Sequence, residues 1–473
     1  MTYRVFFVIL VPIIVLILSS TSGAGPLNSA FSEPTVKDSG LKVETVFHGL
    51  KFPTSMVILK NGDILALEKN EGTVVKISNG SLQEDPLLDV DVATQGERGL
   101  LGIAFSENKR ENVTFVFLFF TQAMGSEGRD ICPNDADVFP YCRSGDEPIG
   151  NMVYRYQLDD RNRLVNPKLL LDLPSSPNRH NGGPLLIGPD RNLYALIGDL
   201  NRTTRAQNFL NGTEPDGTSG ILRITQDGQP VLNGSIIGEE YPMNLYYAYG
   251  IRNSFGMDFD PVTGNLWDTE NGLLYGDEIN LVKPGFNSGW SRIQGVWDSK
   301  QVGNQSRELY WEAILPRSKD VMTEDPRSLA TFNGKGNYSQ PEFTWGFSVA
   351  PTALKFLNSD KLGKEYENDI FVGDFKYGNL YRFDLNGNRT QLNLNGSLAH
   401  KIANNEDELN SMLFGQGFGA ITDLEVGPDG NLYVLSLYKG GWDCRLTPEN
   451  CVPYNSTVGG TIFRISQAKN PVS

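Results

Sequence analysis

Residue types capable of proton transfer and charge stabilisation gather in four segments, each next to a predicted strand. His180, one of three histidines in the chain, lies in the loop RHNGG before such a strand. A neutral imidazole is the natural general base near pH 7, although a single histidine is more often a structural side chain. Because Gly182 and Gly183 have no Cβ, a flat ligand could approach the backbone closely there. This segment is therefore a candidate for proton abstraction beside a flat ligand.

Three further segments carry polar and charged residues in loops that flank predicted strands. Arg252 and Asn253 precede a strand in YGIRNSFG, and an acidic return loop, ENGLLYGDE, follows that strand. A fixed guanidinium can stabilise negative charge, but a solvated acidic loop beside a surface arginine is the plainer interpretation. The remaining segments are TWGFSVAPT, with Trp345 and Ser348, and FVGDFKYGN, with Lys376.

The elements that would position these segments are short strands in a repeated pattern. A turn of Gly, Asp or Asn leads into an alternating strand, a second turn and another strand, and Asp-Gly and Asn-Gly turns between such strands are a strong hairpin signal. Copies lie at residues 60–78, 189–199 with 220–224, 264–272, 368–385 and 428–436 with 460–465, and a weaker sixth copy pairs 115–122 with 152–159.

Six sheet units, none able to bury both faces alone, predict an all-β fold. The expected architecture is a six-bladed β-propeller formed as one domain by residues 41–468. A pair of β-sandwiches and a β-helix are the alternatives. Helical pattern is scarce, and residues 405–413 are the one short candidate. Since loops at one mouth of a propeller's channel build its site, we expect function in the inter-blade loops.

Composition and charge restrict the classes of partner. The chain has 473 residues, 39% of them hydrophobic, and 41 basic against 56 acidic residues give a net charge of −15. Binding to duplex nucleic acid needs clustered Lys and Arg, which no window supplies, so no nucleic-acid partner is expected. Three His and four Cys argue against a zinc site of the Cys/His kind.

The N-terminus predicts export from the cytoplasm. Arg4 precedes an apolar run, Val5 to Leu18, and small residues follow, which is the order of a secretory signal. This run is shorter than the ~20 residues needed to span a bilayer, and an uncleaved anchor is the alternative. We predict a signal peptide at 1–24, an N-terminal extension at 25–40 and no membrane span after cleavage. The protein is expected to be secreted or extracytoplasmic, and membrane-associated if the signal is not cleaved.

Cysteines and glycosylation sequences agree with export. Four Cys allow three disulfide connectivities, and short loop closure favours Cys132–Cys142 and Cys444–Cys451. We expect peptide mapping without reduction to recover these two pairs, whereas cross-pairs or free thiols would contradict the pairing.

Asn-x-Ser/Thr sequences indicate a glycosylated surface, unless they only reflect Asn-Gly turns. They begin at Asn79, Asn112, Asn201, Asn211, Asn233, Asn304, Asn337, Asn388, Asn395 and Asn455.

Taken in order, the four segments resemble the glucose/sorbosone dehydrogenase family, the soluble aldose dehydrogenases dependent on pyrroloquinoline quinone (PQQ), over nearly the whole mature chain. The most specific match is YG-x-RN, a strand, then E-x-G and GDEIN, ending at N-x-GW; here it runs from Tyr249 to Trp290. Residues 50–70 and 97–105 match the family's opening pattern. The resemblance implies an enzyme that oxidises an aldose sugar at C1 to the lactone, with PQQ and Ca²⁺ as cofactors and an unidentified electron acceptor.

The resemblance also implies roles for individual residues. His180 matches the catalytic base, and Arg252, with Asn253 beside it, matches the guanidinium that stabilises negative charge on the quinone oxygen. The main-chain carbonyls of Gly272 and Leu273 match ligands of the Ca²⁺ ion. The cofactor-binding positions implied by the family are Glu97 (commonly Gln), Arg252, Asn253, Trp345, Ser348 and Lys376.

Departures from the family pattern weaken the implied cofactor binding. The last blade usually presents Arg-x-Arg-Asp, whereas this chain has Ala420 and Thr422 at the two arginine positions. The family's Arg after Gly-Gly is Pro184 here. PQQ has three carboxylates, and each lost charge-assisted bond costs about 1.5–3 kcal/mol. Arg179 or Lys401 are candidates to replace these cations.

Three functions remain open on the sequence. The first is a secreted quinoprotein sugar dehydrogenase, favoured by His180, Arg252 and Gly272. The second is a propeller that has lost PQQ and binds glycans or proteins outside the cell, favoured by Ala420 and Thr422. A hydrolytic, Ca²⁺-centred propeller such as a lactonase is the third.

Overall fold

The structure is a computed structural model, and strands dominate the part of the chain that it describes. It describes residues 33–108, 112–123, 148–175, 178–209, 214–232, 234–273, 275–296, 326–437, 442–443, 452–453 and 459–468. The predicted signal peptide, both cysteine pairs and the sequences at Asn211, Asn233, Asn304 and Asn455 lie outside these ranges. In the described ranges, no helix has the length and apolar character needed to cross a membrane.

The described strands form six sheets of four to six strands and one two-stranded hairpin. From its first strand outward, the first sheet contains β3 (Pro53–Ile58), β4 (Ile64–Glu68), β5 (Thr73–Ser78) and β6 (Ser81–Leu82), with β7 (Leu88–Asp89) also on β5. The second contains β8 (Leu100–Asn108), β9 (Val113–Ala123), β10 (Pro148–Leu158) and β11 (Leu164–Leu173). The third contains β12 (Leu185–Ile187), β13 (Leu193–Ile197), β14 (Gly220–Ile224), β15 (Tyr246–Tyr249), β19 (Phe286–Asn287) and β20 (Asn337–Tyr338).

The remaining sheets follow the same antiparallel plan in their first four strands. The fourth contains β16 (Gly256–Phe259), β17 (Leu266–Glu270), β18 (Asp277–Val282), β21 (Phe343–Trp345) and β25 (Ile402–Ala403). The fifth contains β22 (Pro351–Phe356), β23 (Ile370–Asp374), β24 (Leu380–Phe383), β26 (Leu413–Gln416) and β1 (Thr35–Val36). The sixth contains β27 (Ile421–Val426), β28 (Leu432–Ser436), β31 (Gly460–Gln467) and β2 (Leu41–Leu50), and the hairpin is β29 (Trp442–Asp443) with β30 (Val452–Pro453).

Helical structure is limited to short segments in the described ranges. The α-helix α2 (Glu406–Met412) lies within the predicted segment 405–413, and the side chain of Asn405 caps it by accepting a hydrogen bond from the Glu408 backbone at 3.0 Å. The 3₁₀ helices are η1 (Thr203–Arg205), η2 (Met243–Leu245), η3 (Pro326–Ser328), η4 (Lys364–Tyr366) and η5 (Gly396–His400).

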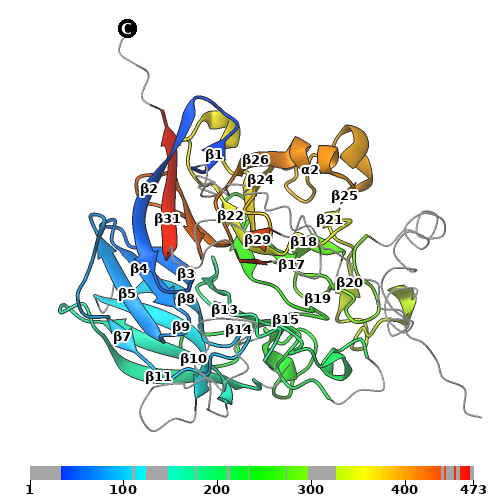
Figure 1. Ribbon diagram of the computed structural model, residues 1–473. Coiled ribbons are helices and arrows are strands. Elements are labelled where there is room, and N and C mark those ends of the chain that lie inside the picture. Colours follow the sequence, from blue (N-terminus) through cyan, green and yellow to red (C-terminus); the bar gives the residue numbers. More distant parts are fainter. Residues whose placement is uncertain are drawn as a thin grey trace, which may run out of the picture. The chain divides into compact units, whose positions relative to one another are not determined.

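The first strands of the sheets pack against one another in a circular order, which is the arrangement of a β-propeller. The strand β3 contacts β8, β8 contacts β12, β16 contacts β22, β22 contacts β27, and β27 contacts β3. A shared apolar cluster that includes Leu196 and Met257 joins the third and fourth sheets. Figure 1 shows the C-terminal strand β31 beside the N-terminal β2, with which it pairs. The sixth sheet therefore joins the two ends of the propeller chain.

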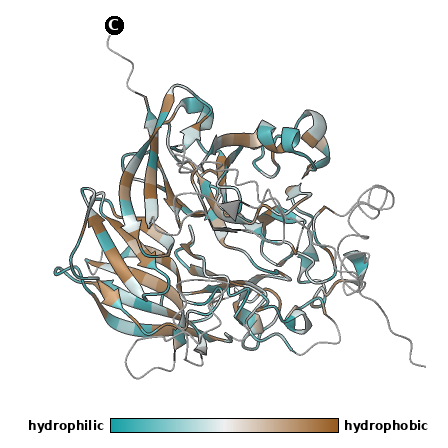
Figure 2. Cartoon of the chain, in the orientation of Figure 1, coloured by the Kyte–Doolittle hydropathy of each residue, from teal (hydrophilic) through white to brown (hydrophobic). Residues whose placement is uncertain are grey.

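Both faces of each sheet are covered by neighbouring sheets, which explains why many strands read as continuous apolar runs. In β4, Leu65 and Leu67 belong to a cluster shared with β8 and β9. The alternate residues Ile64 and Ala66 belong to another cluster shared with β28 and β31. Successive side chains of a strand point to opposite faces. Figure 2 shows hydrophobic colour concentrated along strands and hydrophilic colour in connecting turns.

The repeated sequence units correspond to strand pairs of the structure. Phe119 pairs with Val153 between β9 and β10, which confirms the weaker sixth copy. The segments 193–197 and 220–224 pair as β13 and β14, and β28 pairs with β31. Part of the predicted N-terminal extension, Thr35–Val36, joins the fifth sheet as β1.

Candidate functional site

The loops that carry most of the predicted site residues meet at one mouth of the propeller. The second strand of each sheet runs antiparallel to the first, so the loop before the first strand and the loop after the second lie at the same end. His180 and Arg252 lie in loops of the first kind, before β12 and β16. Asp199, Gly272 and Lys376 lie in loops of the second kind, after β13, β17 and β23.

His180 forms a buried pair with Asp199. The imidazole Nδ1 lies 2.6 Å from Asp199 Oδ1, and the His180 side chain is 8% exposed. The other carboxylate oxygen, Oδ2, accepts a hydrogen bond from the Trp290 indole nitrogen at 2.8 Å. With the carboxylate as acceptor, a neutral imidazole carries its proton on Nδ1 and presents a lone pair on Nε2. The sequence alone did not identify Asp199 and Trp290 as site residues. Asp199 is the last residue of the motif IGD, which directly follows a predicted strand.

Glu97 and Asn253, both predicted to bind the cofactor, hold the His180 loop in place. The Glu97 carboxylate accepts hydrogen bonds from the His180 backbone at 2.6 Å and from the Asn253 side-chain amide at 3.2 Å. The Asn253 oxygen accepts a bond from the Gly182 backbone at 3.2 Å. His180 adopts a left-handed conformation, φ 58°, which is costly for a residue with a Cβ. These bonds therefore hold the histidine in a conformation that it would not adopt alone.

Close backbone packing explains the glycines around His180. A Cβ on Gly182 would lie 2.5 Å from the Leu196 carbonyl oxygen. A Cβ on Gly198 would lie 2.4 Å from the His180 carbonyl oxygen and 2.7 Å from that of Arg252. We expected Gly182 to leave room for a flat ligand, but its missing side chain makes room for the neighbouring strand.

Arg252 lies beside this pair and is held by main-chain carbonyls. Its guanidinium donates hydrogen bonds to the carbonyls of Asn271 at 2.8 Å and Gly272 at 2.9 Å, and it stacks 5.4 Å from the Trp290 ring. Burial lowers the pKa of the guanidinium, and the carboxylates of Asp199 and Glu97 oppose this shift. The Arg252 Nε is buried and has no partner among the described residues. Arg252 therefore retains a donor for a negatively charged ligand.

One of the two predicted calcium ligands, the Gly272 carbonyl, is engaged with a protein group in this structure. The Gly272 carbonyl accepts a hydrogen bond from the positively charged Arg252, and Leu273 is 43% exposed. Within the described ranges, no cluster of three or more His, Cys, Asp or Glu could hold a metal ion. A cation at the Gly272 carbonyl would lie beside a guanidinium whose charge has the same sign.

This competition leads to a prediction for calcium binding. We expect Arg252→Gln to bind Ca²⁺ about tenfold more tightly than the parent protein, because the change frees the Gly272 carbonyl and removes a like charge. Calorimetric titration without PQQ measures the affinity. Arg223→Gln, in β14 and away from this carbonyl, is the control. Equal or weaker binding to Arg252→Gln would show that Arg252 does not compete with the ion.

The last three predicted cofactor residues occupy different environments. Trp345 is fully buried in an apolar cluster and packs edge-on against Phe343 at 4.9 Å between ring centroids, so the structure places it in the core. Lys376 and Ser348 lie together at the mouth, where the lysine ammonium donates to the Ser348 carbonyl at 3.3 Å. Of these three, Lys376 and Ser348 lie at the mouth and Trp345 lies in the core.

At positions 420 and 422, where the family has arginines, the side chains of this protein contact other protein groups. Ala420 is fully buried, and the Thr422 hydroxyl donates to the Pro53 carbonyl at 3.2 Å. Lys401 pairs with Glu342 at 2.9 Å beside the outer strands β21 and β25, so it does not replace the missing arginines at the mouth. Arg179 is exposed next to His180.

Three buried carboxyl groups lie in β17 and β18, below Arg252. Glu270 and Glu278 are directly opposite each other, and Asp268 is two residues from Glu270 on the same face. Burial raises the pKa of Glu270 to about 7 and holds the pKa values of Asp268 and Glu278 well above the usual range. Both Asp268 carboxyl oxygens lack a hydrogen-bond partner among the described residues. Burial therefore favours the neutral form of Asp268.

These raised pKa values make stability depend on pH. Since the folded-state values exceed the unfolded ones, the stabilising contribution is complete below the ordinary carboxyl pKa and is lost as pH rises through about 7. We expect Asp268→Asn to raise the free energy of unfolding at pH 8 by about 1–3 kcal/mol and to reduce its decline between about pH 5 and 8. Denaturant unfolding at both pH values measures this, with the exposed Asp190→Asn as control. An unchanged pH dependence would contradict the assignment.

Comparison with known proteins agrees with this arrangement. The sequence profile described as glucose/sorbosone dehydrogenase matches residues 50–313 and 320–442. The chain is 25% identical over 401 residues to an aldose sugar dehydrogenase of Escherichia coli, covering 81% of this chain and 89% of that protein. It is 25% identical over 393 residues to quinoprotein glucose dehydrogenase B of Acinetobacter calcoaceticus, covering 74% and 78%.

A solved structure shows the same fold. The PQQ-bound aldose sugar dehydrogenase of Streptomyces coelicolor superposes with a TM-score of 0.57 at 21% identity, covering 92% of this chain and all of that one. The family profile covers well over half of the chain, including the loops that carry His180, Arg252 and Lys376. The protein therefore belongs to the glucose/sorbosone dehydrogenase family.

Proposed function

We propose that the protein is a quinoprotein dehydrogenase that oxidises an aldose at C1 to the lactone, with PQQ as hydride acceptor. The observation that carries this proposal is the buried His180–Asp199 pair beside Arg252. Family membership supports an oxidoreductase, and the names of relatives support an aldose substrate and a quinone cofactor.

His180 would act as the general base in this reaction. Its Nε2 takes the proton of the C1 hydroxyl while the C1–H bond breaks and a C=O bond forms at C1. Asp199 holds the imidazole in the reactive tautomer and stabilises the imidazolium that results. When bound, PQQ supplies the carbonyl carbon that accepts the hydride from C1. The Arg252 guanidinium stabilises the negative charge that develops beside it.

The described residues include donors that fit PQQ. The buried Arg252 Nε and the Lys376 ammonium are donors suited to a quinone oxygen and a carboxylate. The family resemblance implies calcium at the carbonyls of Gly272 and Leu273, where the ion would act as a Lewis acid, although the Gly272 carbonyl already accepts from Arg252.

The test is to add PQQ to the purified protein, with and without Ca²⁺, and to record absorbance before and after aldoses are supplied. We expect PQQ to bind, and glucose or a related aldose to reduce the bound quinone and an artificial dye. If PQQ does not bind under either condition, the quinoprotein function is wrong.

An extracellular binding module is the second candidate. It is favoured by Ala420 and Thr422, which replace two cofactor-gripping arginines of the family and are tied into the core and to Pro53. Absence of PQQ binding together with retention of glycans on an array would favour this function.

The finer architecture and location belong to the same proposal. The circular packing of first strands supports closure as a six-bladed propeller. The Val5 to Leu18 run and the glycosylation sequences support secretion or another location outside the cytoplasm, with association to the membrane if the signal is retained.

A further inference from the structure

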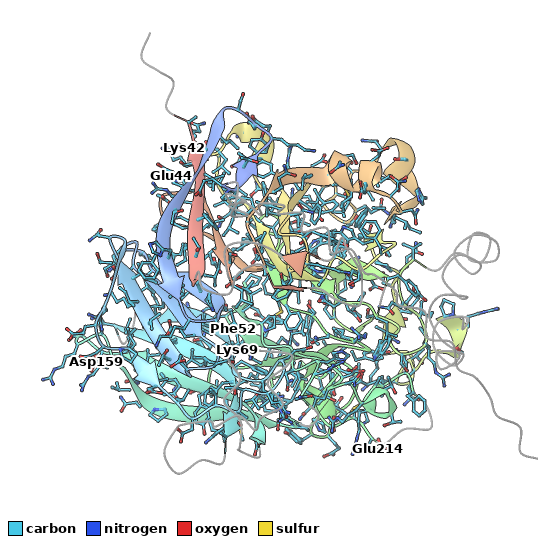
Figure 3. All side chains as sticks on the ribbon, in the orientation of Figure 1. Lys42, Glu44, Phe52, Lys69, Asp159 and Glu214 are labelled. Atoms are coloured by element: carbon cyan, nitrogen blue, oxygen red, sulfur yellow. The ribbon has the colours of Figure 1, made fainter. Side chains whose placement is uncertain are left out.

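Asp277 is a fully buried carboxylate at the start of β18, and its two oxygens accept hydrogen bonds from two different loops. Oδ1 accepts from the Gly272 backbone at 2.7 Å, whereas Oδ2 accepts from the backbones of Val349 at 2.7 Å and Ala350 at 2.8 Å. Figure 3 shows side chains filling the space around the strands, where a buried carboxylate must find its partners within the protein. Asp277 therefore ties the loop after β17, in the fourth sheet, to the segment that leads into β22 of the fifth.

Each of these two segments supports one cation of the proposed PQQ site. The first supports the guanidinium of Arg252, which donates to the Gly272 carbonyl at 2.9 Å. The second supports Lys376, whose backbone N–H and side-chain ammonium donate to the carbonyls of Val349 and Ser348, each at 3.3 Å. One buried carboxylate thus joins the supports of both cations.

The segment before β22 depends on this carboxylate for its conformation. Ala350 has a left-handed backbone, φ 55°, which is costly for a residue with a Cβ. Burial raises the pKa of the Asp277 carboxyl, and the three backbone N–H groups and Arg252 oppose this shift. Removing the carboxylate would leave these buried N–H groups without their acceptor. The two segments would then no longer be held at a fixed separation.

We propose that Asp277 is a positioning residue that fixes the separation of Arg252 and Lys376, so that both cations bind one PQQ molecule. The inference rests on the proposed quinoprotein function. Because PQQ is a rigid fused-ring molecule, preorganised cations contact it together without a further ordering cost.

Electrostatics alone predicts the opposite effect of removing this carboxylate. The negative charge of Asp277 acts on Arg252, so its loss would strengthen the attraction between the guanidinium and an anionic ligand. Positioning predicts weaker binding, because the two cations lose their common support. The sign of the change in PQQ affinity therefore distinguishes the two explanations.

The test is the affinity for PQQ, measured by quenching of protein fluorescence at one fixed Ca²⁺ concentration. We expect Asp277→Asn to weaken binding by about 10–100-fold, because its single oxygen serves one loop while its NH₂ group faces the N–H donors of the other. Lys376→Gln should weaken binding by about 10–100-fold in the parent. Added to Asp277→Asn, it should weaken binding by less than about threefold, because the lysine is already displaced.

Asp260→Asn is the matched control. Asp260 is also a buried carboxylate that joins the fourth and fifth sheets, since it accepts from Arg389 at 2.8 Å. It follows the first strand β16 and therefore lies at the end of the sheet opposite the mouth. This variant should keep the parental PQQ affinity, and Lys376→Gln should keep its full effect in that background.

A second variant at the same position separates positioning from a failure to fold. Asp277→Ser removes the charge, and its side chain is too short to reach both loops, so it gives the same readout if thermal unfolding shows that the Asn variant is not folded. Suppose the parent binds PQQ, but the folded variants bind it equally or more tightly, or Lys376→Gln keeps its full effect in them. The inference is then wrong and the quinoprotein function stands. If the parent does not bind PQQ, both are wrong.

Discussion

Replacing His180 with Ala is expected to lower kcat for sugar oxidation by about 10²–10⁴-fold, the usual contribution of a general base. The affinity for PQQ should stay within a few-fold of the parent value, because Arg252 and Lys376, which we propose to hold the cofactor, are unchanged. The parent kcat should rise with pH, because only a neutral imidazole can accept the C1 hydroxyl proton. This rise should disappear in His180→Ala.

The measurement is dye reduction at saturating PQQ and sugar across pH, with thermal unfolding as the check on folding. His48→Ala is the control, since His48 is exposed on the outer strand β2. Wild-type sugar oxidation by His180→Ala would exclude His180 as the base.

Asp199→Asn is expected to lower kcat by a comparable factor, about 10²–10⁴-fold, while the fold and PQQ binding are kept. The buried carboxylate accepts from the imidazole Nδ1 and from the Trp290 indole N–H. An asparagine has only one side-chain oxygen. If that oxygen accepts from the Trp290 N–H, the NH₂ group faces the imidazole Nδ1 and donates to it. The imidazole proton would then reside on Nε2, and the base would be lost.

The kinetic signature distinguishes this positioning role from a structural one. We expect kcat to fall with little change in the sugar KM, and the pH dependence seen in the parent to be altered. Asp190→Asn provides the matched control, because Asp190 is an exposed carboxylate at the opposite end of the same sheet. If Asp199→Asn oxidises sugar at the parental rate, the His180–Asp199 pair is not the catalytic base system.

Local sequence patterns predicted the strands and most of their pairing. Alternating residues and Asn-Gly turns determine hairpins over short distances, as in β3 and β4, where Gly62 in the turn has φ 87°. The sheets that result have two apolar faces, and this local property already requires further sheets on both sides. His180 could be identified because histidine is rare in this chain. Arg252 could be identified because it lies in a motif whose residues follow one another in a specific order.

The tertiary structure decided which of these residues act together. Trp290 reaches Asp199 across 91 positions of the chain, and Thr422 reaches Pro53 across 369. No periodicity in the sequence encodes such contacts, because they form only when the sheets pack in a circle and their loops meet at one mouth. The same packing placed Arg252 on the carbonyl expected to bind calcium and placed Trp345 in the core. Strand patterns are local and can be predicted from the sequence, whereas the partners of loop side chains depend on closure of the whole domain.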